Sequence, residues 1–368
     1  MNNICSKRLV VSAVNICEGG ALTILFECLN SAAKYLGQEW EIIALLHHEE
    51  LINNPRIRII VYPESKQSWH QRLLLEWYRF NKLSIALKPD LWLSLHDITP
   101  RVTSKRRVVY CHNSSPFYSL SWREALQDPK FLLFNLFYKY LYQINISRNY
   151  AVVVQQDWLR VFFAQIFHHS NIIVSYPAFK QGTMQIGNNA DSNKYIYLYP
   201  ALPRVFKNIE VLCRAAAMLP VQLQSKIQIR LTIDGSENAY SRYIVKKFGG
   251  YTALRFIGCQ NRDEMAKQYA ECGTVLFPSK LETWGLPISE AKAFNRSLLV
   301  ADLPYAHETV GSYDSVSFLP PNDIASWAKA IELITLGSWV HHGSIGTEPA
   351  LPFAQDWPHL WELLIDGL

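Results

Sequence analysis

The sequence predicts an α/β protein built from two doubly wound parallel sheets, each with helices on both faces. Short runs of β-branched and aromatic residues alternate with longer amphipathic stretches, which is typical of parallel α/β layering. The 368 residues are enough for two domains of ordinary size. A polar stretch near the middle, rich in Gly, Asn and Ser, disfavours regular structure and suits a linker.

The first half of the chain alternates strand and helix patterns throughout. The expected strands are 9–14, 41–46, 57–61, 91–95, 107–111, 152–155 and 172–174. The expected helices are 21–36, 67–86, 129–144 and 158–166. We therefore expect a Rossmann-like domain over residues 1–178, followed by a linker over 179–194.

The second half repeats the alternation. The expected strands are 195–199, 227–233, 254–257, 274–277, 298–301 and 316–318. The expected helices are 208–218, 238–248, 262–271, 286–294 and 324–336. This gives a second Rossmann-like domain over 195–345, and an amphipathic tail over 346–368 that we expect to pack back on the first domain. Two sheets that face each other leave a cleft, and open α/β sheets bind ligands beyond the carboxyl ends of their strands.

Composition narrows the function classes. Apolar residues make up 49% and charged residues 18%, a globular balance, and the net charge of +5 is mild. It suits anionic small ligands or an anionic membrane surface and gives little support for nucleic-acid binding. The seven cysteines are scattered without a Cys-x-x-Cys pair, and the first residues lack a signal-peptide pattern. We therefore expect a cytoplasmic protein with reduced thiols.

The most informative motif is FPSKLETWGLPISE, which follows a strand pattern and opens a helix pattern. The N–H groups at that helix start belong to Thr283, Trp284, Gly285 and Leu286. Exposed N–H groups at a helix start suit a phosphate. Glu290, one turn into the helix, can accept hydrogen bonds from two hydroxyls, as of a ribose, and Glu282 in the loop can reach a sugar hydroxyl. The alternative is two surface glutamates beside an ordinary helix start.

This motif resembles the E-x7-E element of the retaining glycosyltransferases of family 4, which have the GT-B fold. The resemblance covers most of residues 195–336 and, more weakly, the N-terminal half. It implies that Glu282 contacts the donor sugar and Glu290 the nucleotide ribose. The family usually has glycine and proline where this chain has Asn295-Arg296-Ser297. Because Asn tolerates a left-handed backbone better than most residues, we expect the turn to survive.

A basic loop follows the first strand of the second half. Arg204 and Lys207 lie there just before a helix pattern. Arginine can hold a diphosphate in bidentate fashion and lysine as a point charge. The resemblance places the family's phosphate-binding Arg and Lys on these two residues, in a loop shorter than the commonest family form. The alternative is a solvated basic loop.

Three further strand ends resemble parts of the family's site. Gly19 and Gly20 match its glycine loop, which faces the donor diphosphate and the acceptor, although paired glycines also make tight turns. His112 matches a cleft-facing histidine near the donor sugar, and its alternative is a structural histidine. Gly235 matches the glycine loop on the nucleotide side.

Metal and cofactor motifs are missing from the sequence. It has no Asp-x-Asp, no Walker P-loop, no Gly-x-Ser-x-Gly and no His-Glu-x-x-His. We therefore expect no metal and no cofactor, with the nucleotide-diphosphate sugar as a substrate.

Two stretches, 66–88 and 130–142, mix aromatic and basic residues. Basic amphipathic helices with aromatics can lie at a membrane interface, but helices that cover a buried sheet look much the same. A peripheral contact with the inner face of the cytoplasmic membrane is the functional interpretation.

Together the resemblance implies a retaining, metal-independent glycosyltransferase. It would move a sugar from a nucleotide-diphosphate sugar to a hydroxyl of a glycan acceptor, either free or lipid-linked, in the biosynthesis of a bacterial surface polysaccharide. Arg204, Lys207, Glu282 and His112 are the expected catalytic residues. Two alternatives stay open: a sugar-nucleotide epimerase of similar architecture, and a binding subunit without turnover.

Overall fold

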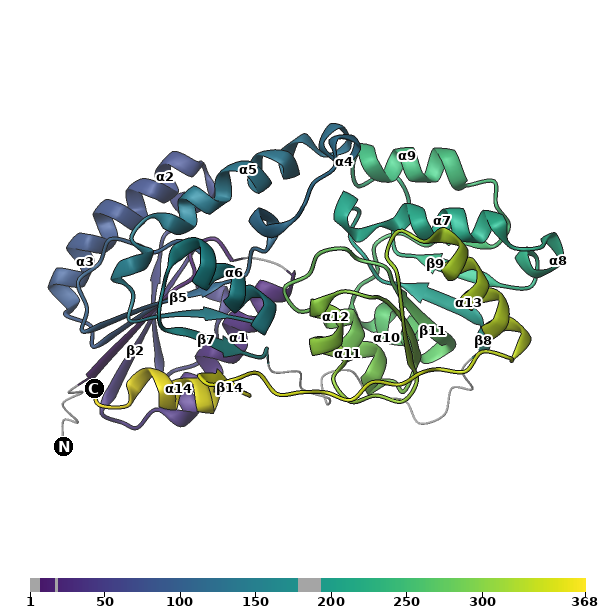
Figure 1. The fold of residues 1–368 in the computed structure, drawn as a ribbon. Coiled ribbons are helices and arrows are strands. Elements are labelled where there is room, and N and C mark those ends of the chain that lie inside the picture. The colour runs from purple at the N-terminus through teal and green to yellow at the C-terminus, as the bar shows by residue number, and fades with distance from the viewer. Residues whose placement is uncertain (1–6, 17–18, 178–192) are drawn as a thin grey trace. The chain divides into compact units, whose positions relative to one another are not determined.

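The chain forms two compact units (Figure 1). The computed structural model describes residues 7–16, 19–177 and 193–368. The first unit comprises Met1–Phe117, Asn135–Ala178 and Pro349–Leu368, and the second comprises Tyr118–Phe134 and Phe179–Glu348. Of the expected linker over 179–194, all but the last two residues lie outside the described residues, and those two belong to a strand.

The first unit contains one parallel sheet with the strand order β14-β7-β6-β5-β4-β1-β2-β3. Its strands are β1 (Lys7–Ser12), β2 (Trp40–Leu46), β3 (Ile57–Val61), β4 (Leu91–Ser94), β5 (Arg106–Cys111), β6 (Ala151–Val154), β7 (Ile172–Ser175) and β14 (Phe353–Ala354). Its helices are α1 (Gly19–Tyr35), α2 (Trp69–Leu74), α3 (Phe80–Leu87), most of α5 (Pro129–Gln143), α6 (Asp157–Phe167) and α14 (Trp357–Ile365). Short 3-10 turns connect several of them.

The order of the strands fixes where a ligand can bind in this unit. The chain adds β2 and β3 on one side of β1 and then returns to add β4 to β7 on the other side. The strand order therefore reverses between β1 and β4. In doubly wound sheets the ligand crevice lies beyond the carboxyl ends of the strands at such a reversal.

Both faces of this sheet are buried, which explains the nearly continuous apolar runs of its strands. In β1, Leu9 and Val11 belong to one core cluster, with side chains of α1 and α14. Val10, between them, belongs to another cluster that includes Phe80 of α3 and Trp92 of β4. Successive residues of one strand thus serve opposite helical layers.

The helix expected over 67–86 is interrupted. It is observed as α2, a π-helical turn at Leu75–Arg79 and α3. The π turn includes Glu76, a carboxylate with no exposed surface. Such turns occur mostly as single insertions in α-helices, frequently at functional sites, and hydrophobic periodicity does not reveal them.

The second unit contains a six-stranded parallel sheet with the order β10-β9-β8-β11-β12-β13. Its strands are β8 (Asn193–Tyr199), β9 (Gln228–Leu231), β10 (Leu254–Phe256), β11 (Cys272–Phe277), β12 (Ser297–Ala301) and β13 (Val316–Leu319). Its helices are α4 (Trp122–Gln127), the start of α5, α7 (Ile209–Met218), α8 (Val221–Gln224), α9 (Ala239–Phe248), α10 (Arg262–Glu271), α11 (Leu286–Ala293), α12 (Pro304–Val310) and α13 (Ile324–Leu336). The order reverses between β8 and β11, so the loops after these two strands meet at one place.

The predicted turn after α11 is confirmed. Asn295 has a φ of 54°, which is the left-handed conformation that asparagine accepts. The turn leads from α11 into β12. The departure from the usual glycine therefore preserves the backbone path.

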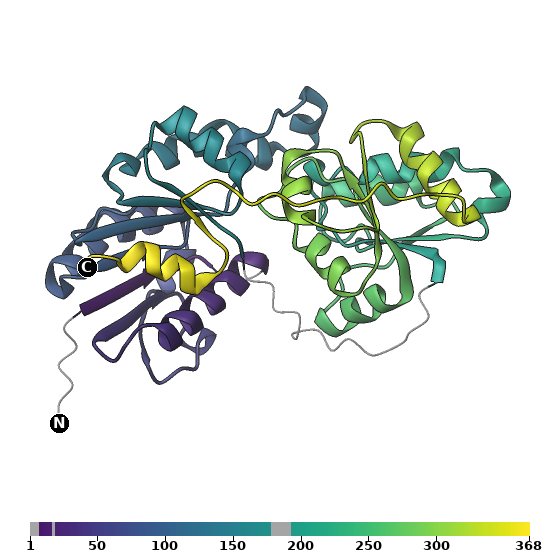
Figure 2. The ribbon, with the colours of Figure 1, turned by 60° about the horizontal axis from the view of Figure 1, so that its bottom comes forward.

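The C-terminal segment belongs to the first unit. β14 pairs with β7 in parallel, and α14 packs against α1 (Figure 2). Trp361 of α14 is fully buried, and its Nε1 donates a hydrogen bond to Ser31 Oγ at 3.2 Å. The last residues of the chain thus complete the core of its first unit.

We expect Trp361→Ala to destabilise the first unit by roughly 3–5 kcal/mol, because it removes a large buried side chain and leaves a cavity. The matched control is Trp122→Ala, since Trp122 is 68% exposed. Urea unfolding followed by circular dichroism measures both. Equal shifts for the two variants would contradict the docking of α14 described above.

Candidate active site

The loops after β8 and β11 bring two of the predicted site residues into direct contact. Lys207 Nζ lies 2.5 Å from Glu282 Oε1, and both side chains are largely buried, at 16% and 12% exposed. The two loops are also joined through the backbone, because the N–H of Lys280 donates to the carbonyl of Phe206 at 2.7 Å. The reversal of strand order therefore produces a fixed lysine–glutamate pair.

Two more cations lie in the same loops, and each faces a carboxylate from residues 118–134. Arg204 Nη1 lies 3.6 Å from Asp128 Oδ2, and the arginine side chain is half exposed. Lys280 Nζ lies 3.2 Å from Glu124 Oε1. Sequence reasoning missed Lys280, although it lies within the quoted motif, and it missed both carboxylates because they are distant in the chain.

Glu124 is held in its ionised form. Burial alone would raise the pKa of this carboxyl. Hydrogen bonds from Ser121 and the Tyr118 hydroxyl, and the charge of Lys280, outweigh burial and bring the pKa below its ordinary value. The side chain therefore presents a full negative charge to Lys280 at neutral pH.

The predicted anion site is the start of α11. Thr283, Trp284 and Gly285 precede this helix, and Leu286 is its first residue. Gly285 has a φ of 89°, and a Cβ at this position would approach the Phe277 ring to 3.3 Å, so glycine suits the turn on both counts. No side chain caps this helix start in the described part of the chain. Its first N–H groups are thus not claimed by a capping side chain.

Glu290 lies one turn into α11, as predicted, and contacts a residue of α10. Its Oε2 accepts a hydrogen bond from the Tyr269 hydroxyl at 2.5 Å. Burial raises the pKa of Glu290, and the Tyr269 hydrogen bond offsets only part of this effect. The direct contacts of Glu282 and Glu290 therefore differ: the first faces a lysine and the second a tyrosine.

Gly235 lies in the loop after β9 with a φ of 94°. Its N–H donates to Glu237 Oε2 at 3.0 Å, and the N–H of Asp234 donates to Glu237 Oε1 at 2.9 Å. The two amides of this glycine loop thus bind a carboxylate of their own chain.

The first unit contains the other predicted residues. Gly19 and Gly20 begin α1, after a loop in which Cys17 and Glu18 lie outside the described residues. His112 follows β5, and its N–H donates to Asp97 Oδ1 at 2.5 Å. These residues lie at the carboxyl ends of their strands, as the sequence predicted.

Asp97 organises the backbone around His112. Its carboxylate also accepts hydrogen bonds from the Asn113 N–H at 3.1 Å and from the hydroxyls of Tyr138 and Tyr142 at 3.0 and 3.1 Å. Asp97 has a φ of 70°, a strained value for a residue with a side chain. It is a positioning residue that sequence reasoning missed, although it lies in the loop that follows β4.

The imidazole of His112 stacks on the Tyr110 ring with 4.8 Å between ring centroids. Burial lowers the pKa of His112, and the Asp97 carboxylate offsets only part of the shift. Its Nε2 is buried and makes no hydrogen bond within the described part of the chain. The ring is therefore neutral at pH 7.

A buried ion pair lies close to Asp97. Arg72 Nε lies 2.8 Å from Glu76 Oε1, and His96 Nδ1 lies 3.3 Å from the same oxygen. Burial raises the pKa of Glu76 to about 7, against the lowering effect of Arg72. No local sequence pattern indicates this cluster, because its members come together only when α2 and the π turn pack on the sheet.

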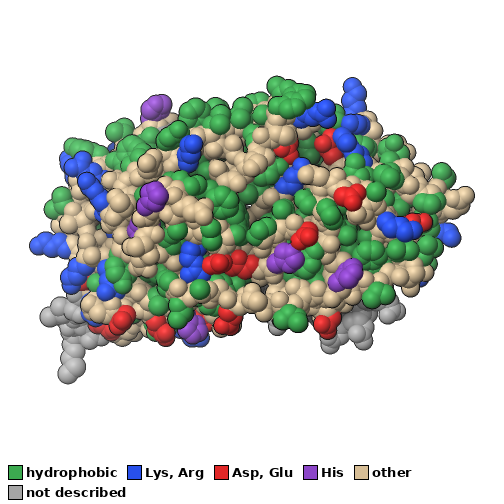
Figure 3. Space-filling model, in the orientation of Figure 1, with side chains coloured by type: hydrophobic (Ala, Val, Ile, Leu, Met, Phe, Trp, Pro, Cys, Tyr) green, Lys and Arg blue, Asp and Glu red, His purple; other side chains and the backbone are tan. Residues whose placement is uncertain are grey.

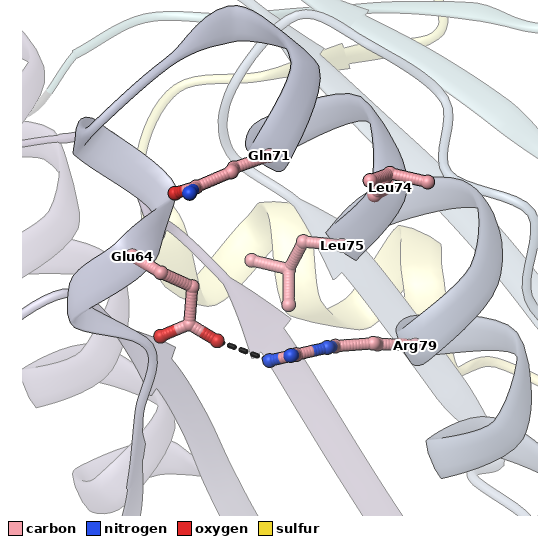
Figure 4. Close-up of a pocket in the computed structure, with 5 residues that line it drawn as sticks. All are labelled: Glu64, Gln71, Leu74, Leu75 and Arg79. Carbon is pink, nitrogen blue, oxygen red and sulfur yellow. Dashed lines mark hydrogen bonds and ion pairs between the residues drawn. The ribbon is translucent and has the colours of Figure 1, made fainter.

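A pocket of about 220 Å³ lies beside β3 in the first unit (Figure 4). It is lined by Glu64, Gln71, Leu74, Leu75 and Arg79. Glu64 and Arg79 pair with each other across it. Their charges cancel, so the pocket offers no surplus positive charge to a diphosphate.

The described residues contain neither a metal-binding cluster nor a membrane-spanning helix. No group of three His, Cys, Asp or Glu side chains in that part of the chain is arranged to hold a metal ion. No helix there is long and apolar enough to cross a bilayer.

Comparisons with known proteins concern the second half of the chain above all. Residues 180–338 match the model of the family described as glycosyl transferases group 1. A stretch of 129 residues is 27% identical to the serotype-specific mannosyltransferase WbdA of Escherichia coli, covering 34% of this chain. The chain spans only 16% of the length of that relative.

Solved structures show the fold. Sucrose-phosphate synthase of Thermosynechococcus elongatus is 17% identical with a TM-score of 0.66, covering 90% of both chains. HepE of Anabaena, solved with UDP and glucose, is 14% identical with a TM-score of 0.60, covering 90% of this chain and 93% of that one. These structures show that the chain has the GT-B fold. Within that fold, the second half of the chain carries the likeness to group 1 glycosyl transferases, over residues 180–338.

We expect Tyr269→Phe to destabilise the protein more as the pH rises from 5 to 8. The raised pKa of Glu290 means that the folded state favours the protonated carboxyl, so this group's contribution to stability falls as pH rises through that pKa. Without the Tyr269 hydroxyl the ionised carboxylate loses a donor, at a cost of about 1–3 kcal/mol, whereas the protonated form loses less.

Urea unfolding at a series of pH values measures this effect. In a Glu290→Gln background the cost of Tyr269→Phe should be independent of pH. The same pH dependence in both backgrounds would contradict the assignment.

Proposed function

We propose that this protein transfers a glycosyl group from a nucleoside-diphosphate sugar to a hydroxyl of a glycan acceptor, with retention of configuration and without a metal. The observation that carries the proposal is the cation cluster at the β8–β11 reversal, beside the start of α11. Arg204, Lys207 and Lys280 come from two loops that are hydrogen-bonded to each other. Such a cluster matches the charge of a diphosphate.

The reaction needs this charge because negative charge grows on the diphosphate as the glycosidic bond breaks. Lys207 and Arg204 would stabilise that charge, together with the N–H groups at the start of α11. Glu282 would bind a hydroxyl of the donor sugar, and Glu290 the ribose. In this proposal the positive side chains and the helix start stabilise the charge of the leaving diphosphate, and no divalent cation is needed.

The contact between Glu282 and Lys207 supports a front-face route. A carboxylate held 2.5 Å from a lysine is a poor nucleophile, which distinguishes the site from a two-carboxylate retaining hydrolase. In the proposed step the acceptor oxygen bonds to the anomeric carbon as the bond from that carbon to the phosphate oxygen breaks. The acceptor proton passes to the leaving phosphate oxygen. His112, neutral and with a buried Nε2, would accept a hydrogen bond from a sugar hydroxyl.

The likeness to a serotype-specific mannosyltransferase supports an acceptor that is a growing bacterial surface polysaccharide. The glycan acceptor would be recognised in the first unit, beyond the strand ends that precede His112 and the Gly19-Gly20 pair. A cytoplasmic location agrees with a nucleotide-sugar donor.

We expect Lys207→Ala to lower kcat by about 10²–10³, because it removes a charge that stabilises the leaving group. The control is Lys329→Ala, which removes a lysine paired with Glu332 on α13. The donor is first found by thermal shift with a panel of nucleotide sugars, and product is then quantified by chromatography. Near-normal turnover of Lys207→Ala would overturn the proposed role.

The same assay separates the alternatives. Turnover in excess EDTA should equal that without it, whereas loss of activity restored by Mg²⁺ would contradict a metal-free site. Incubation with donor alone should leave the sugar nucleotide unchanged, because an isomerised sugar would favour an epimerase. Tight donor binding without product would favour a binding subunit.

We further propose that the first unit binds an anionic membrane through a basic apolar face, defined as the exposed side chains of α2 to α3 and of α5. The exposed apolar residues of this face that belong to the first unit are Leu74, Tyr78, Ile85, Leu136, Phe137 and Tyr140. Each is between 48% and 64% exposed. The exposed lysines on these helices and their ends in the first unit are Lys82, Lys88 and Lys139, and the exposed Arg79 pairs with Glu64. The acidic residue of these helices, Glu76, is buried.

The two parts of this face are neighbours. Tyr138 of α5 is close enough to Arg72 and Glu76 for their charges to act on its hydroxyl. Hydrophobic and basic side chains are both visible along the edge that carries α2 and α5 (Figure 3). Exposed aromatic and aliphatic side chains beside basic ones are the composition of an interfacial helix. Such a contact would hold the protein at the membrane that carries a lipid-linked acceptor.

We expect the wild-type protein to co-sediment with vesicles of phosphatidylglycerol and phosphatidylcholine, and less so at high salt. Leu136→Glu with Phe137→Glu should weaken this binding about tenfold or more, because each change adds repulsion and removes apolar contact. The control is Val221→Glu with Leu336→Glu, which alters exposed apolar residues of the second unit. Equal binding of both double variants would contradict the proposed face.

A further inference from the structure

Residues 118–134, named the strap here, carry two carboxylates to the cation cluster. The strap lies between β5 and β6 in the chain, yet it groups with the second unit. It contains α4 and the first residues of α5. Its contacts with the loops after β8 and β11, named the donor loops here, are therefore contacts within one compact unit.

The strap is held on these loops at three points. Glu124 pairs with Lys280 at 3.2 Å, and Asp128 lies 3.6 Å from Arg204. Phe131 packs against Phe206, with 5.0 Å between ring centroids. Phe206 is also the residue whose carbonyl joins the two donor loops.

Both carboxylates are shielded from water and fixed by their own neighbours. The side chains of Glu124 and Asp128 are each only 13% exposed. Glu124 belongs to a capping box with Ser121 at the start of α4. Asp128 Oδ1 accepts from the Phe131 N–H at 3.0 Å at the start of α5. A fixed, largely buried carboxylate facing a cation is costly to leave unpaired.

We propose that Lys280 is a third diphosphate ligand, and that Glu124 and Asp128 occupy Lys280 and Arg204 until the donor diphosphate displaces them. This inference rests on the proposed function and names the groups that regulate its donor site. A diphosphate offers more negative charge and more acceptor oxygens than a carboxylate, so it competes for the same two cations. The strap therefore lowers the apparent affinity for the donor by the fraction of molecules in which it is docked.

Inorganic pyrophosphate tests the exchange without knowledge of the base or the sugar. Isothermal titration calorimetry of the full chain at fixed ionic strength compares the wild type with Glu124→Gln/Asp128→Asn. Gln and Asn keep the capping hydrogen bonds at the starts of α4 and α5, so the helices are preserved. The matched control is Glu271→Gln/Glu332→Gln, which removes two carboxylates that are ion-paired elsewhere in the unit.

We expect the strap variant to bind pyrophosphate about tenfold more tightly than the control variant. Adding Lys280→Ala to the strap variant should remove most of that gain. Equal or weaker binding by the strap variant, or no effect of Lys280→Ala, would overturn the inference.

Hydrogen exchange of residues 118–134 supplies a second readout. In the wild type, saturating pyrophosphate should speed exchange in the strap, and the strap variant should exchange fast without ligand. Binding of pyrophosphate with an unchanged strap would overturn this inference and leave the proposed function intact. Absence of pyrophosphate binding in every variant would overturn the diphosphate site itself.

Discussion

Parallel strands buried on both faces leave only their ends free for chemistry, and the whole site follows from that constraint. Successive side chains of β1 pack against the helices on opposite faces of the sheet, so Leu9, Val10 and Val11 are all buried in the core. Each proposed functional residue therefore comes from a loop beyond a carboxyl end, or from the first turns of the helix that follows. The position of the reversal in strand order then decides which loops meet.

In the second unit this constraint concentrates positive charge, and the structure neutralises it locally. Lys207 faces Glu282, Lys280 faces Glu124 and Arg204 faces Asp128. Even the glycine loop after β9 binds a carboxylate, that of Glu237. The proposed anion site is thus neutralised by the chain's own carboxylates, because unpaired charges are costly to bury.

Much of the fold and part of the candidate site could be predicted from local sequence patterns. The alternation of apolar runs located most strands, since a strand buried on both faces is apolar throughout. Asn295 predicted a left-handed turn because few other residues accept one. Lys207 and Glu282 each belong to a motif that can be recognised by itself in the sequence. Their contact follows once both motifs are placed at the ends of neighbouring strands.

What the sequence withheld depends on contacts between distant residues. No pattern reports that β8 lies between β9 and β11, and this order is what joins the two donor loops. Glu124 and Asp128 look like ordinary helix-capping residues until they are seen against Lys280 and Arg204. The π turn and the buried Glu76 depend on packing rather than on periodicity, so helical spacing predicted one continuous helix instead.

Helix α5 contains residues of both compact units. It begins with strap residues that contact the loops after β8 and β11, and it continues to Tyr138 and Tyr142, whose hydroxyls bind the carboxylate that holds the backbone of His112. The sequence of this one helix therefore has to satisfy contacts in both compact units at once.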